Sequence, residues 1–428
     1  MIKVQGVIVS HSNYLIIGSS HAALSALEAI RIQDTEGSIT LVTQEDTLPY
    51  SPTILPYVIS GQIDPEQIFL RDAEALDRHR VTFKKGARVV AVDPANHSVS
   101  MDSGETLKYE KMLLATGAEP TLPPIPGVKD ASCHVLRTLG DAVRLQSIAQ
   151  KAKSAIILGA GLIGMHAAEN LAKAGVQIAI VEALPRVLPG YFDEQAAGLV
   201  QQVFTEHGIK ILTGSTVTHV TASNGTCTVS LESGGELSGD LLLVATGVRA
   251  RMDYLAGSGI DIGEGIVVDD TMRTSSRDIW AAGDVAEARS FFGGKKRVNA
   301  NLPNAVEQGR IAGMDMVGDS ALKPFTGGIA RNAYHFFGHR AFSVGLVGRA
   351  ESAGGIEVDQ VFLPSSVQYQ KMVFEDDRLV AVSGVNTMLD PGIMYELVRQ
   401  RVDLSEVKAR FAAGPLQMGR ILMSKIWG

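Results

Sequence analysis

One pattern occurs twice in this chain and limits its fold more than any other feature. The segment YLIIGSS at 14–20 is an apolar strand that runs into a glycine turn, followed by a helical spacing and a second strand, SITLVTQE. The segment SAIILGAGLIGMHAAENLAKAGVQIAIVEA at 154–183 repeats this order. Strands that alternate with helices predict βαβ units, so we expect an α/β fold with two related halves.

Each copy is followed further along the chain by an apolar strand that ends in Ala-Thr-Gly. These strands are KMLLATGAEP at 111–120 and LLLVATGVRA at 241–250. Between the copies, the proline-rich stretch EPTLPPIPG reads as a linker. From about Gly328 the pattern changes to FSVGLVG, YQKMVFEDDRLVAVSGV and a helical PGIMYELVRQRV, which predicts a separate α+β domain.

The glycine turn LGAGLIG at 158–164 is the most specific motif in the sequence. Gly159 permits the tight turn, Gly161 lets the backbone approach a pyrophosphate, and Gly164 allows the helix to pack closely on the strand. The motif follows a strand and opens a helix whose N-terminus favours negative charge. It therefore predicts a dinucleotide site in the second copy.

The acid at the end of the next strand predicts which dinucleotide binds there. Glu182 is placed to accept hydrogen bonds from a ribose diol, which favours NAD because a 2'-phosphate would meet a like charge. Arg186 lies near enough in sequence to keep NADP open. The predicted NAD site consists of Gly159, Gly161, Leu162, Ile163, Gly164, Glu182, Ala245, Thr246 and Gly247.

The first copy has a looser turn, GSSHAA at 18–23, in which Ser20 replaces the middle glycine. Gly18 still fits the tight turn. We expect Glu45 to be the ribose ligand of this copy, although Thr43 stands where the simplest alignment would put the acid. The alternative for Glu45 is a solvated loop carboxylate.

Composition excludes several other classes of function. A net charge of -7 over 428 residues argues against nucleic acid as a partner, because no basic excess is available to neutralise phosphates. The two cysteines, Cys133 and Cys227, are far apart, so neither a metal site of the usual kind nor a CxxC redox pair is expected. We expect a reducing, cytoplasmic location, no signal peptide and no membrane span.

Taken in order, IIGSSHAA, ATGAEP, ILGAGLIG, VATGVR and IWAAGDV resemble the FAD-dependent pyridine nucleotide oxidoreductases over nearly the whole chain. The similarity is greatest to the NADH oxidases, NADH peroxidases, CoA-disulfide reductases and ferredoxin or rubredoxin reductases. The resemblance implies an FAD-binding domain at 1–120 and 250–327, an NAD-binding domain at 121–249, and a C-terminal interface domain at 328–428.

The resemblance also implies which residues hold the flavin nucleotide. The aspartate of AAGD would hold the ribityl chain, and the helix in NLPNAVEQGRIAG would point its positive N-terminus at the reduced flavin. The alternative for this stretch is a surface helix with a solvated Glu307. The implied FAD site consists of Gly18, Ser20, His21, Ala22, Glu45, Thr53, Ala115, Thr116, Gly117, Gly283, Asp284, Pro303, Asn304 and Ala305.

Thr53 is the main departure from the family pattern. Related sequences often carry a cysteine beside the flavin, and here TILPY puts Thr53 at that position. A hydroxyl cannot cycle through a sulfenic acid or a disulfide, so peroxide, water-forming oxidase and CoA-disulfide chemistry by that route are disfavoured. His21, which would serve the thiol, then either bonds near the pyrophosphate or has another role.

His166 is a second departure, because the family often has glutamate there, close to the nicotinamide and the flavin. Histidine could bond a carboxamide or the flavin edge. The alternative is a partly buried packing histidine. We therefore place Thr53, His21 and His166 near the flavin and expect no side-chain nucleophile, since the flavin itself does the chemistry.

The segment ARSFFGGKKRVNAN at 288–301 carries Lys295, Lys296 and Arg297 just before the helix implied to face the flavin. Such a patch could steer an acidic electron-transfer protein. The alternative is a solvated, charged loop.

Without a thiol or cluster ligands, the second redox partner must lie outside this chain. We expect an NAD(H)-dependent FAD oxidoreductase that exchanges electrons with an iron–sulfur protein. The chain resembles the NAD-binding flavin subunits of anaerobic complexes such as phenylglyoxylate dehydrogenase and tungsten aldehyde oxidoreductase, so we expect a homodimer or a subunit of a hetero-oligomer. Two alternatives stay open: a free-standing NADH oxidase or diaphorase using oxygen or quinone, and a non-catalytic subunit that keeps FAD for structure or sensing.

Overall fold

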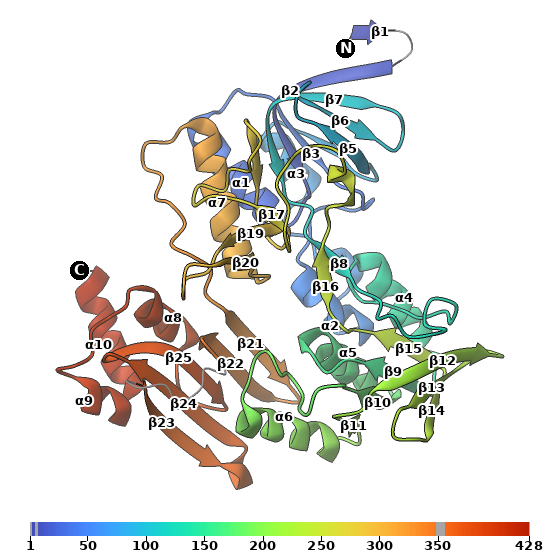
Figure 1. Cartoon of the computed structure of the whole chain (residues 1–428), viewed down its shortest axis with the longest axis vertical. Helices are drawn as coiled ribbons and strands as arrows, with labels where there is room; N and C mark the ends of the chain where they lie inside the picture. The colour runs from blue at the N-terminus through green and yellow to red at the C-terminus, as the bar shows by residue number, and fades with distance from the viewer. Residues whose placement is uncertain (1, 5–6, 348–355, 428) are drawn as a thin grey trace. The chain divides into compact units, whose positions relative to one another are not determined.

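Three segments of the chain build each of two units in the computed structural model, which describes residues 2–4, 7–347 and 356–427 (Figure 1). Unit 1 contains Met1–Ile54, Glu66–Glu119 and Val248–Ile329. Unit 2 contains Leu55–Pro65, Pro120–Gly247 and Ala330–Gly428. Both units are therefore interrupted along the sequence, and the expected three-domain boundaries stay a prediction.

The main sheet of unit 1 has the strand order β4-β3-β2-β7-β6-β5, with β1 beside β2 and β18 beside β7. β2, β3, β4, β7 and β18 are parallel, whereas β5 and β6 extend the sheet in antiparallel fashion. The strands are β1 (Ile2–Val4), β2 (Val7–Ile17), β3 (Ile39–Val42), β4 (Val81–Lys84), β5 (Val89–Asp93), β6 (Ser98–Met101), β7 (Thr106–Leu114) and β18 (Ile279–Ala281).

Helix α1 joins β2 to β3, and α7 packs beside α1. The contact is close because small residues line it: a Cβ added at Gly309 of α7 would lie 2.1 Å from the carbonyl oxygen of Ala22 in α1. The other elements here are α1 (His21–Gln33), η1 (Pro52–Ile54), η2 (Pro65–Gln67), α3 (Ala73–Arg78), β8 (Ala118–Pro120), β16 (Val248–Ala250), η3 (Asp253–Leu255), β17 (Ile266–Val267), β19 (Ala286–Arg289), β20 (Lys296–Val298) and α7 (Leu302–Val317).

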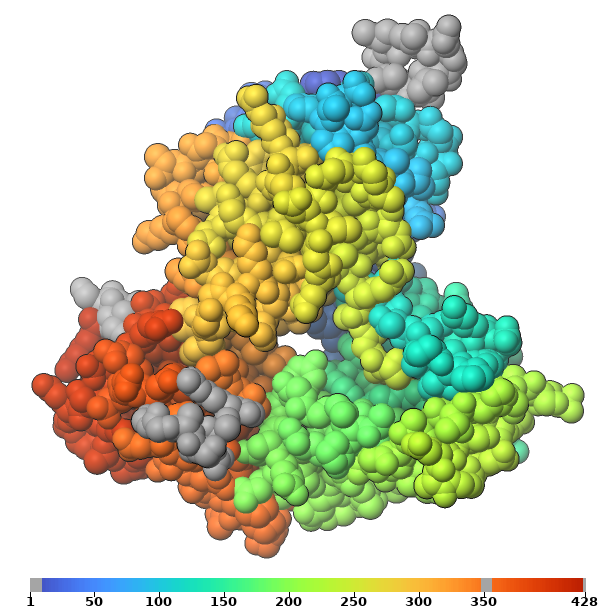
Figure 2. All heavy atoms as spheres, in the orientation of Figure 1, coloured from blue at the N-terminus to red at the C-terminus, as the bar shows by residue number. Residues whose placement is uncertain are grey.

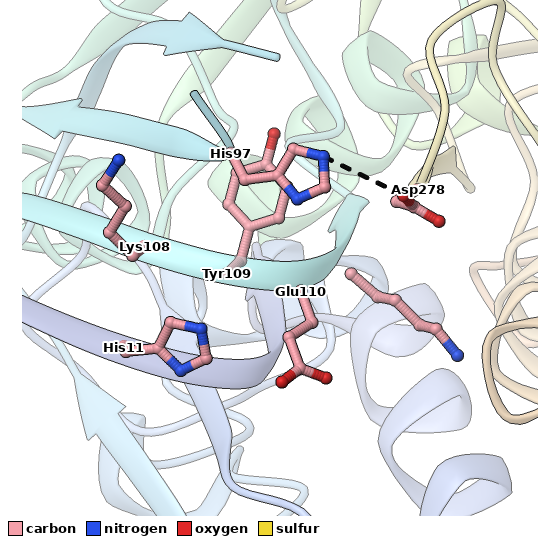
Figure 3. A pocket seen from close by; sticks show the side chains of 7 residues that line it. His11, His97, Lys108, Tyr109, Glu110 and Asp278 are labelled. Carbon is pink, nitrogen blue, oxygen red and sulfur yellow. Dashed lines mark ion pairs between the residues drawn. The ribbon is translucent and has the colours of Figure 1, made fainter. Parts of the chain in front are cut away.

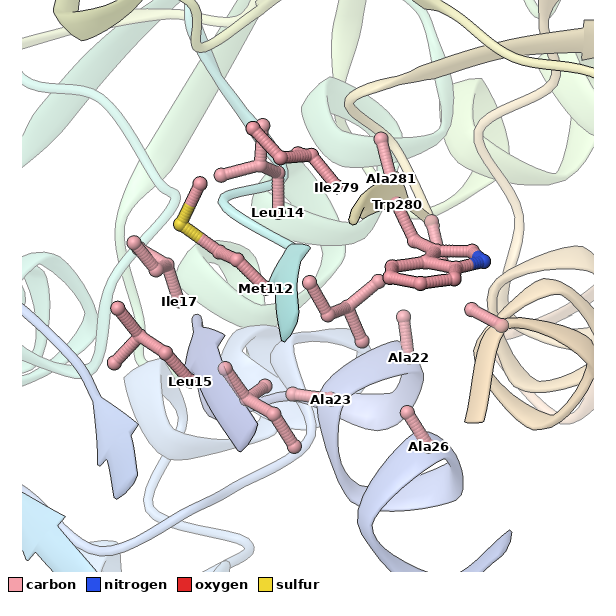
Figure 4. Packing of buried hydrophobic residues seen from close by; sticks show 14 of the residues in the cluster. Leu15, Ile17, Ala22, Ala23, Ala26, Met112, Leu114, Ile279, Trp280 and Ala281 are labelled. Carbon is pink, nitrogen blue, oxygen red and sulfur yellow. The ribbon is translucent and has the colours of Figure 1, made fainter. Parts of the chain in front are cut away.

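The core of unit 1 lies between this sheet and α1. Figure 4 shows Leu15 of β2, Met112 of β7 and Ala23 of α1 in one cluster of buried side chains. Trp280 of β18 is 1% exposed, and its indole Nε1 donates a hydrogen bond of 2.8 Å to Asp315 of α7. The core thus holds α1 on the sheet, and the hydrogen bond from Trp280 ties α7 to β18.

Unit 2 contains a second parallel sheet in the order β11-β10-β9-β15 and a small antiparallel sheet in the order β12-β13-β14. Apolar residues are buried along β9 and β15, as expected of a sheet covered on both faces. Its elements are α2 (Leu55–Ile59), α4 (Leu139–Ala149), β9 (Ser154–Leu158), α5 (Leu162–Lys173), β10 (Gln177–Val181), α6 (Glu194–Glu206), β11 (Lys210–Leu212), β12 (Val217–Ser223), β13 (Thr226–Leu231), β14 (Glu236–Gly239) and β15 (Leu241–Val244).

The remainder of unit 2 is an antiparallel sheet with helices after it, which confirms the α+β character expected of the tail. Its strand order is β21-β22-β25-β24-β23. The elements are β21 (Arg331–Phe336), β22 (His339–Gly345), β23 (Ile356–Leu363), η4 (Pro364–Ser366), β24 (Gln368–Glu375), β25 (Arg378–Val385), α8 (Pro391–Arg399), α9 (Lys408–Ala413) and α10 (Pro415–Trp427).

The duplication seen in the sequence is present in the backbone. The N–H of Gly18 donates to the carbonyl of Val42 at 2.8 Å, and the N–H of Gly159 donates to the carbonyl of Val181 at the same distance. The central strand of each copy lies between two parallel neighbours, β3 and β7 in one and β10 and β15 in the other. The expected α/β fold with two related halves is therefore confirmed.

Within the described residues, no helix has both the length and the apolar character needed to cross a membrane.

Candidate dinucleotide-binding sites

The glycine turn of the second copy leaves room where a pyrophosphate would bind. Gly159 has φ +103°, and a Cβ there would lie 2.4 Å from the carbonyl oxygen of Ala245. A Cβ at Gly164 would lie 2.0 Å from the carbonyl oxygen of Gly159, so this glycine lets α5 approach the turn. By contrast, nothing lies within 4 Å of a Cβ built at Gly161, the N-cap of α5. The open space at this helix N-terminus fits a dinucleotide phosphate.

Glu182 lies directly after β10 and is only 9% exposed. One carboxylate oxygen accepts the N–H of Ala160 in the glycine turn at 2.7 Å, and the other accepts the N–H of Leu184 at 2.9 Å. Each oxygen keeps a free lone pair that could accept from a ribose hydroxyl. The guanidinium of Arg186 is occupied by the carbonyls of Phe192 and Pro189.

The turn of the first copy has the same backbone with a different middle residue. Gly18 has φ +120°, and a Cβ there would lie 2.1 Å from the carbonyl oxygen of Ala115. Ser20 is the N-cap of α1, but its side chain makes no capping hydrogen bond. The serine thus occupies the place of Gly161 while leaving the first N–H groups of α1 open to an anion.

Two further segments converge on this turn. A Cβ built at Gly283 would lie 3.2 Å from the Cβ of Ala22 and 3.6 Å from the Cβ of Ala305. The N–H of Gly283 donates to the amide oxygen of Gln308 at 2.8 Å. The sequence did not single out Gln308, which joins the AAGD turn to α7. The structure therefore brings together three of the segments implied to hold FAD.

The N-terminus of α7 is shaped by asparagines. Asn301 is the N-cap, and its side-chain oxygen accepts the N–H of Asn304 at 3.0 Å. Asn304 is 2% exposed and donates to the carbonyl of Asn299 at 3.2 Å. Pro303 lies in the first turn. Since the first turn carries no acidic side chain, the partial positive charge of the helix end is not cancelled locally.

The two Ala-Thr-Gly turns use their threonines in the same way. The hydroxyl of Thr116 donates to the carbonyl of Arg251 and meets the hydroxyl of Tyr254, both at 3.0 Å. The hydroxyl of Thr246 donates to the carbonyl of Thr121 at 3.0 Å. These threonines hold the chain where it turns away from each sheet. Ala115, Gly117, Ala245 and Gly247 follow the same strand ends.

Glu45 does not occupy the position equivalent to Glu182. Thr43 does, because its N–H bonds the carbonyl of Lys84 on β4 as the N–H of Glu182 bonds that of Leu212 on β11. Thr43 is 8% exposed, whereas Glu45 is half-buried and accepts a hydrogen bond of 2.6 Å from the hydroxyl of Tyr50. The ribose role of Glu45 stays a prediction.

His21, Ser51 and Thr53 form a continuous hydrogen-bonded chain. The Nε2 of His21 lies 2.9 Å from the Oγ of Ser51, which lies 2.8 Å from the Oγ1 of Thr53. Burial lowers the pKa of His21, and the nearby carboxylate of Asp284 opposes this shift less strongly. The sequence placed His21 and Thr53 together but missed Ser51, whose only signal was its position two residues before Thr53.

His166 belongs to unit 2, where it lies in an aromatic cluster. Its ring centroid is 4.5 Å from that of Tyr334 on β21 and 6.2 Å from that of Tyr57 on α2. The Nε2 of His166 and the hydroxyl of Tyr334 are buried without a hydrogen-bond partner. Burial chiefly, helped by His335 and Lys173, lowers the pKa of His166 to about 4. The imidazole is therefore neutral at physiological pH.

The two cysteines have the character of packing residues. Cys227 is buried in a cluster with Ile156 and Val229, and Cys133 packs against this cluster. Burial raises the pKa of both thiols. Neither is therefore activated as a thiolate.

A separate pocket of about 500 Å³ lies at the other end of the strands of unit 1 (Figure 3). His11 of β2 and Tyr109 of β7 line it, whereas the glycine turn of this copy follows Ile17 and its neighbour Leu114. His97 stacks on Tyr109 with ring centroids 5.3 Å apart. This pocket is therefore distinct from the dinucleotide site.

Two glycine turns, each at the carboxyl end of a parallel sheet, define a protein that binds two dinucleotides for redox chemistry. The model of the pyridine nucleotide-disulphide oxidoreductase family matches residues 12–309. The chain belongs to this family, whose members use FAD and NAD(H), and it is an NAD-dependent FAD oxidoreductase.

Two curated relatives narrow the comparison. The chain is 48% identical to subunit epsilon of the NADH-dependent phenylglyoxylate dehydrogenase of Aromatoleum evansii, over 98% of this chain and 99% of that one. It is 32% identical to the rhodocoxin reductase of Rhodococcus erythropolis, over 72% of each chain. The similarity to the phenylglyoxylate dehydrogenase subunit extends over nearly the full length of both chains.

Among solved structures, putidaredoxin reductase in its covalent complex with putidaredoxin has the same fold. The TM-score is 0.84 at 22% identity, over 95% of this chain and 99% of that one.

Proposed function

We propose that this chain passes electrons between NAD(H) and an iron–sulfur protein or subunit through FAD, without a redox-active cysteine. The single observation that carries the proposal is the hydroxyl pair of Ser51 and Thr53 at the position where related sequences often have a thiol. Hydroxyls cannot store electrons as a disulfide. The flavin must then exchange its second set of electrons with a group outside this chain.

The residues described above would hold the two cofactors. The turn around Gly18, the AAGD turn with Asp284 and the N-terminus of α7 would bind FAD, which accepts a hydride and releases electrons singly. The turn around Gly161 and the carboxylate of Glu182 would bind NAD(H). The neutral imidazole of His166 would accept or donate one hydrogen bond without placing a positive charge beside the nicotinamide.

The comparison with known proteins favours a partner that is a permanently bound subunit of the same enzyme. The relative with 48% identity is named as a subunit of a dehydrogenase, and the similarity covers 98% of this chain. We propose that this chain likewise is the NAD-facing subunit of a cytoplasmic complex, in which it collects electrons from clusters and passes them to NAD+. A homodimer is the other assembly that remains open.

The β19–β20 hairpin is the surface we propose for docking. Lys295, Lys296 and Arg297 are exposed and, within the described part of the chain, form no salt bridge. Arg289, which pairs with Lys296 at the loop end of the hairpin, instead forms a salt bridge with Asp270. The hairpin belongs to the yellow-orange surface in Figure 2 and leads directly into α7. Unpaired positive charge next to the flavin helix would attract an acidic protein face.

Purification from the native source tests the proposal. NADH-dependent dye reduction should co-elute with this chain in a species that is larger than its 45.5 kDa and contains iron. Fast NADH consumption in air by an isolated, iron-free chain would instead identify a free-standing oxidase. A flavin that NADH does not bleach would identify a non-catalytic FAD subunit.

A further inference from the structure

We propose that His21, Ser51 and Thr53 form a proton relay for the flavin, used when electrons enter or leave it singly. The inference rests on the proposed function, because it needs a partner that exchanges electrons without protons. It assigns a role to the three side chains that stand in place of a histidine–thiol pair.

The geometry provides an unbroken path. The distance from Nε2 of His21 to Oγ of Ser51 is 2.9 Å, and the distance from Oγ of Ser51 to Oγ1 of Thr53 is 2.8 Å. Both are normal hydrogen-bond distances. The middle hydroxyl is buried, at 6% exposure, while Thr53 is exposed and His21 is half-buried. Imidazole and hydroxyl groups each donate and accept, so a proton accepted at one end can leave at the other.

The stoichiometry creates the need for such a path. Two electrons and one proton reduce the bound flavin to the form that gives a hydride to NAD+. NADH supplies that proton together with both electrons as hydride, whereas a one-electron donor supplies electrons alone. The proton would pass from Thr53 to the flavin, from Ser51 to Thr53, and from Nε2 of His21 to Ser51, while Nδ1 of His21 takes one from solvent.

The surroundings of His21 suit this task. Burial lowers its pKa, and Asp284 is the charged group that opposes the shift. A neutral imidazole can release a proton from one nitrogen while it accepts one at the other. The reverse movement removes the proton when electrons leave singly.

Separate half-reactions of the FAD-loaded protein test the relay. Flavin reduction is followed by stopped-flow absorbance, with NADH as the hydride donor and reduced methyl viologen as the one-electron donor, in H2O and D2O. We expect a solvent isotope effect chiefly with viologen. Ser51→Ala and Thr53→Val should lower the viologen rate, relative to the NADH rate, by roughly a hundredfold or more, because general acid–base catalysis typically contributes roughly 10²–10⁴-fold. Thr53→Ser should restore the ratio.

Ser12→Ala is the matched control, since it removes another hydroxyl–hydroxyl hydrogen bond of unit 1, the 2.6 Å contact between Ser12 and Thr40. In Ser12→Ala, the ratio of the viologen rate to the NADH rate should equal that of the wild type. An unchanged ratio in Ser51→Ala, or an equal fall of both rates, would overturn the relay. A wild-type flavin that NADH cannot reduce would refute the proposed function, while the viologen rates would still decide the relay.

Side-chain 15N NMR of the full chain without FAD gives a readout independent of activity. Ser51→Ala should move the Nε2 resonance of His21, and Ser12→Ala should not. A His21 resonance that is the same in wild type and Ser51→Ala would show that the hydrogen bond, and with it the relay, is absent.

Discussion

Glu182 uses one carboxylate for two purposes. It holds the glycine turn through the N–H of Ala160 and, as we propose, accepts hydrogen bonds from the ribose of NAD. The sequence predicted the second purpose from the position of the acid after β10. The first was not predictable, because it depends on how the turn folds back over the end of the strand.

The proposed ribose contact of Glu182 can be tested by replacing this single residue. Glu182→Gln should raise the Kd for NADH about 10- to 100-fold, since hydrogen bonds to charged groups contribute about 1.5–3 kcal/mol. It should change the Kd for NADPH less, because the negative charge that disfavours a 2'-phosphate is removed. Binding titrations check both values, and Glu232→Gln, an exposed carboxylate of the same unit, is the control. An equal loss for both nucleotides would refute the ribose role.

The hydrogen bonds around Thr53 show where sequence patterns stop being informative. The sequence motifs identified Thr53 and His21 but not Ser51. Ser51 lies 30 positions from His21 along the chain, so its contact with His21 could not be predicted from the sequence. Only the tertiary packing of α1 against the segment before α2 brings them within 2.9 Å.

At the scale of elements, the prediction was more complete. The structure contains the helices and strands of both βαβ copies and the strands of the tail. It also contains the helix predicted in NLPNAVEQGRIAG, as α7 (Leu302–Val317). These segments are marked by periodicity and by glycine turns, which are local signals. The simplest alignment already put Thr43 at the position of Glu182, and the backbone pairing agrees with it. Glu45 was preferred only because an acid is expected as the ribose ligand.

The turn before α5 yields a prediction that separates folding from binding. Gly161→Ala should leave the free energy of unfolding nearly unchanged, because the new Cβ meets open space at a φ of -74°. It should nevertheless weaken NADH binding strongly, since the methyl group would occupy the place of the pyrophosphate. Denaturant unfolding and NADH titration measure the two effects.

Gly164→Ala is the matched substitution in the same turn. Its Cβ would lie 2.0 Å from the carbonyl oxygen of Gly159, so α5 must shift and the unfolding free energy should fall by about 1–3 kcal/mol. Should both variants lose stability alike, or both keep full NADH affinity, the pyrophosphate assignment to Gly161 would be wrong.

At the scale of the whole molecule, the duplicated sheets confirm what the repeated motif predicted. The environment of His166 was not predictable, because its neighbours come from distant parts of the sequence, Tyr57 and Tyr334. The sequence therefore left a packing role and a nicotinamide role equally open. The unpartnered Nε2 favours neither by itself, but it makes protonation of this ring costly.

That cost predicts how stability depends on pH. The pKa of His166 is lowered from 6.5 to about 4, so between these values the unfolded chain binds a proton that the folded chain does not. Stability should therefore be full above pH 6.5 and fall as the pH drops towards 4, by up to about 3 kcal/mol from this residue. His166→Gln should lose less stability than the wild type between pH 7 and 5 in denaturant titrations.

His219→Gln provides the control, because His219 is an exposed histidine of unit 2. It should retain the acid sensitivity of the wild type. Identical acid profiles for wild type and His166→Gln would mean that the ring is solvated and titrates normally.

The contact between α1 and α7 also has a consequence for biosynthesis. Helix α1 ends at Gln33, whereas its partner α7 does not begin until Leu302, and the segments between them include most of unit 2. On the ribosome, the first glycine turn must therefore wait, without its neighbouring helix, until most of the chain has been translated. Acquisition of the flavin nucleotide is then a late event, so nascent or prematurely terminated chains that lack α7 would be colourless and dependent on chaperones.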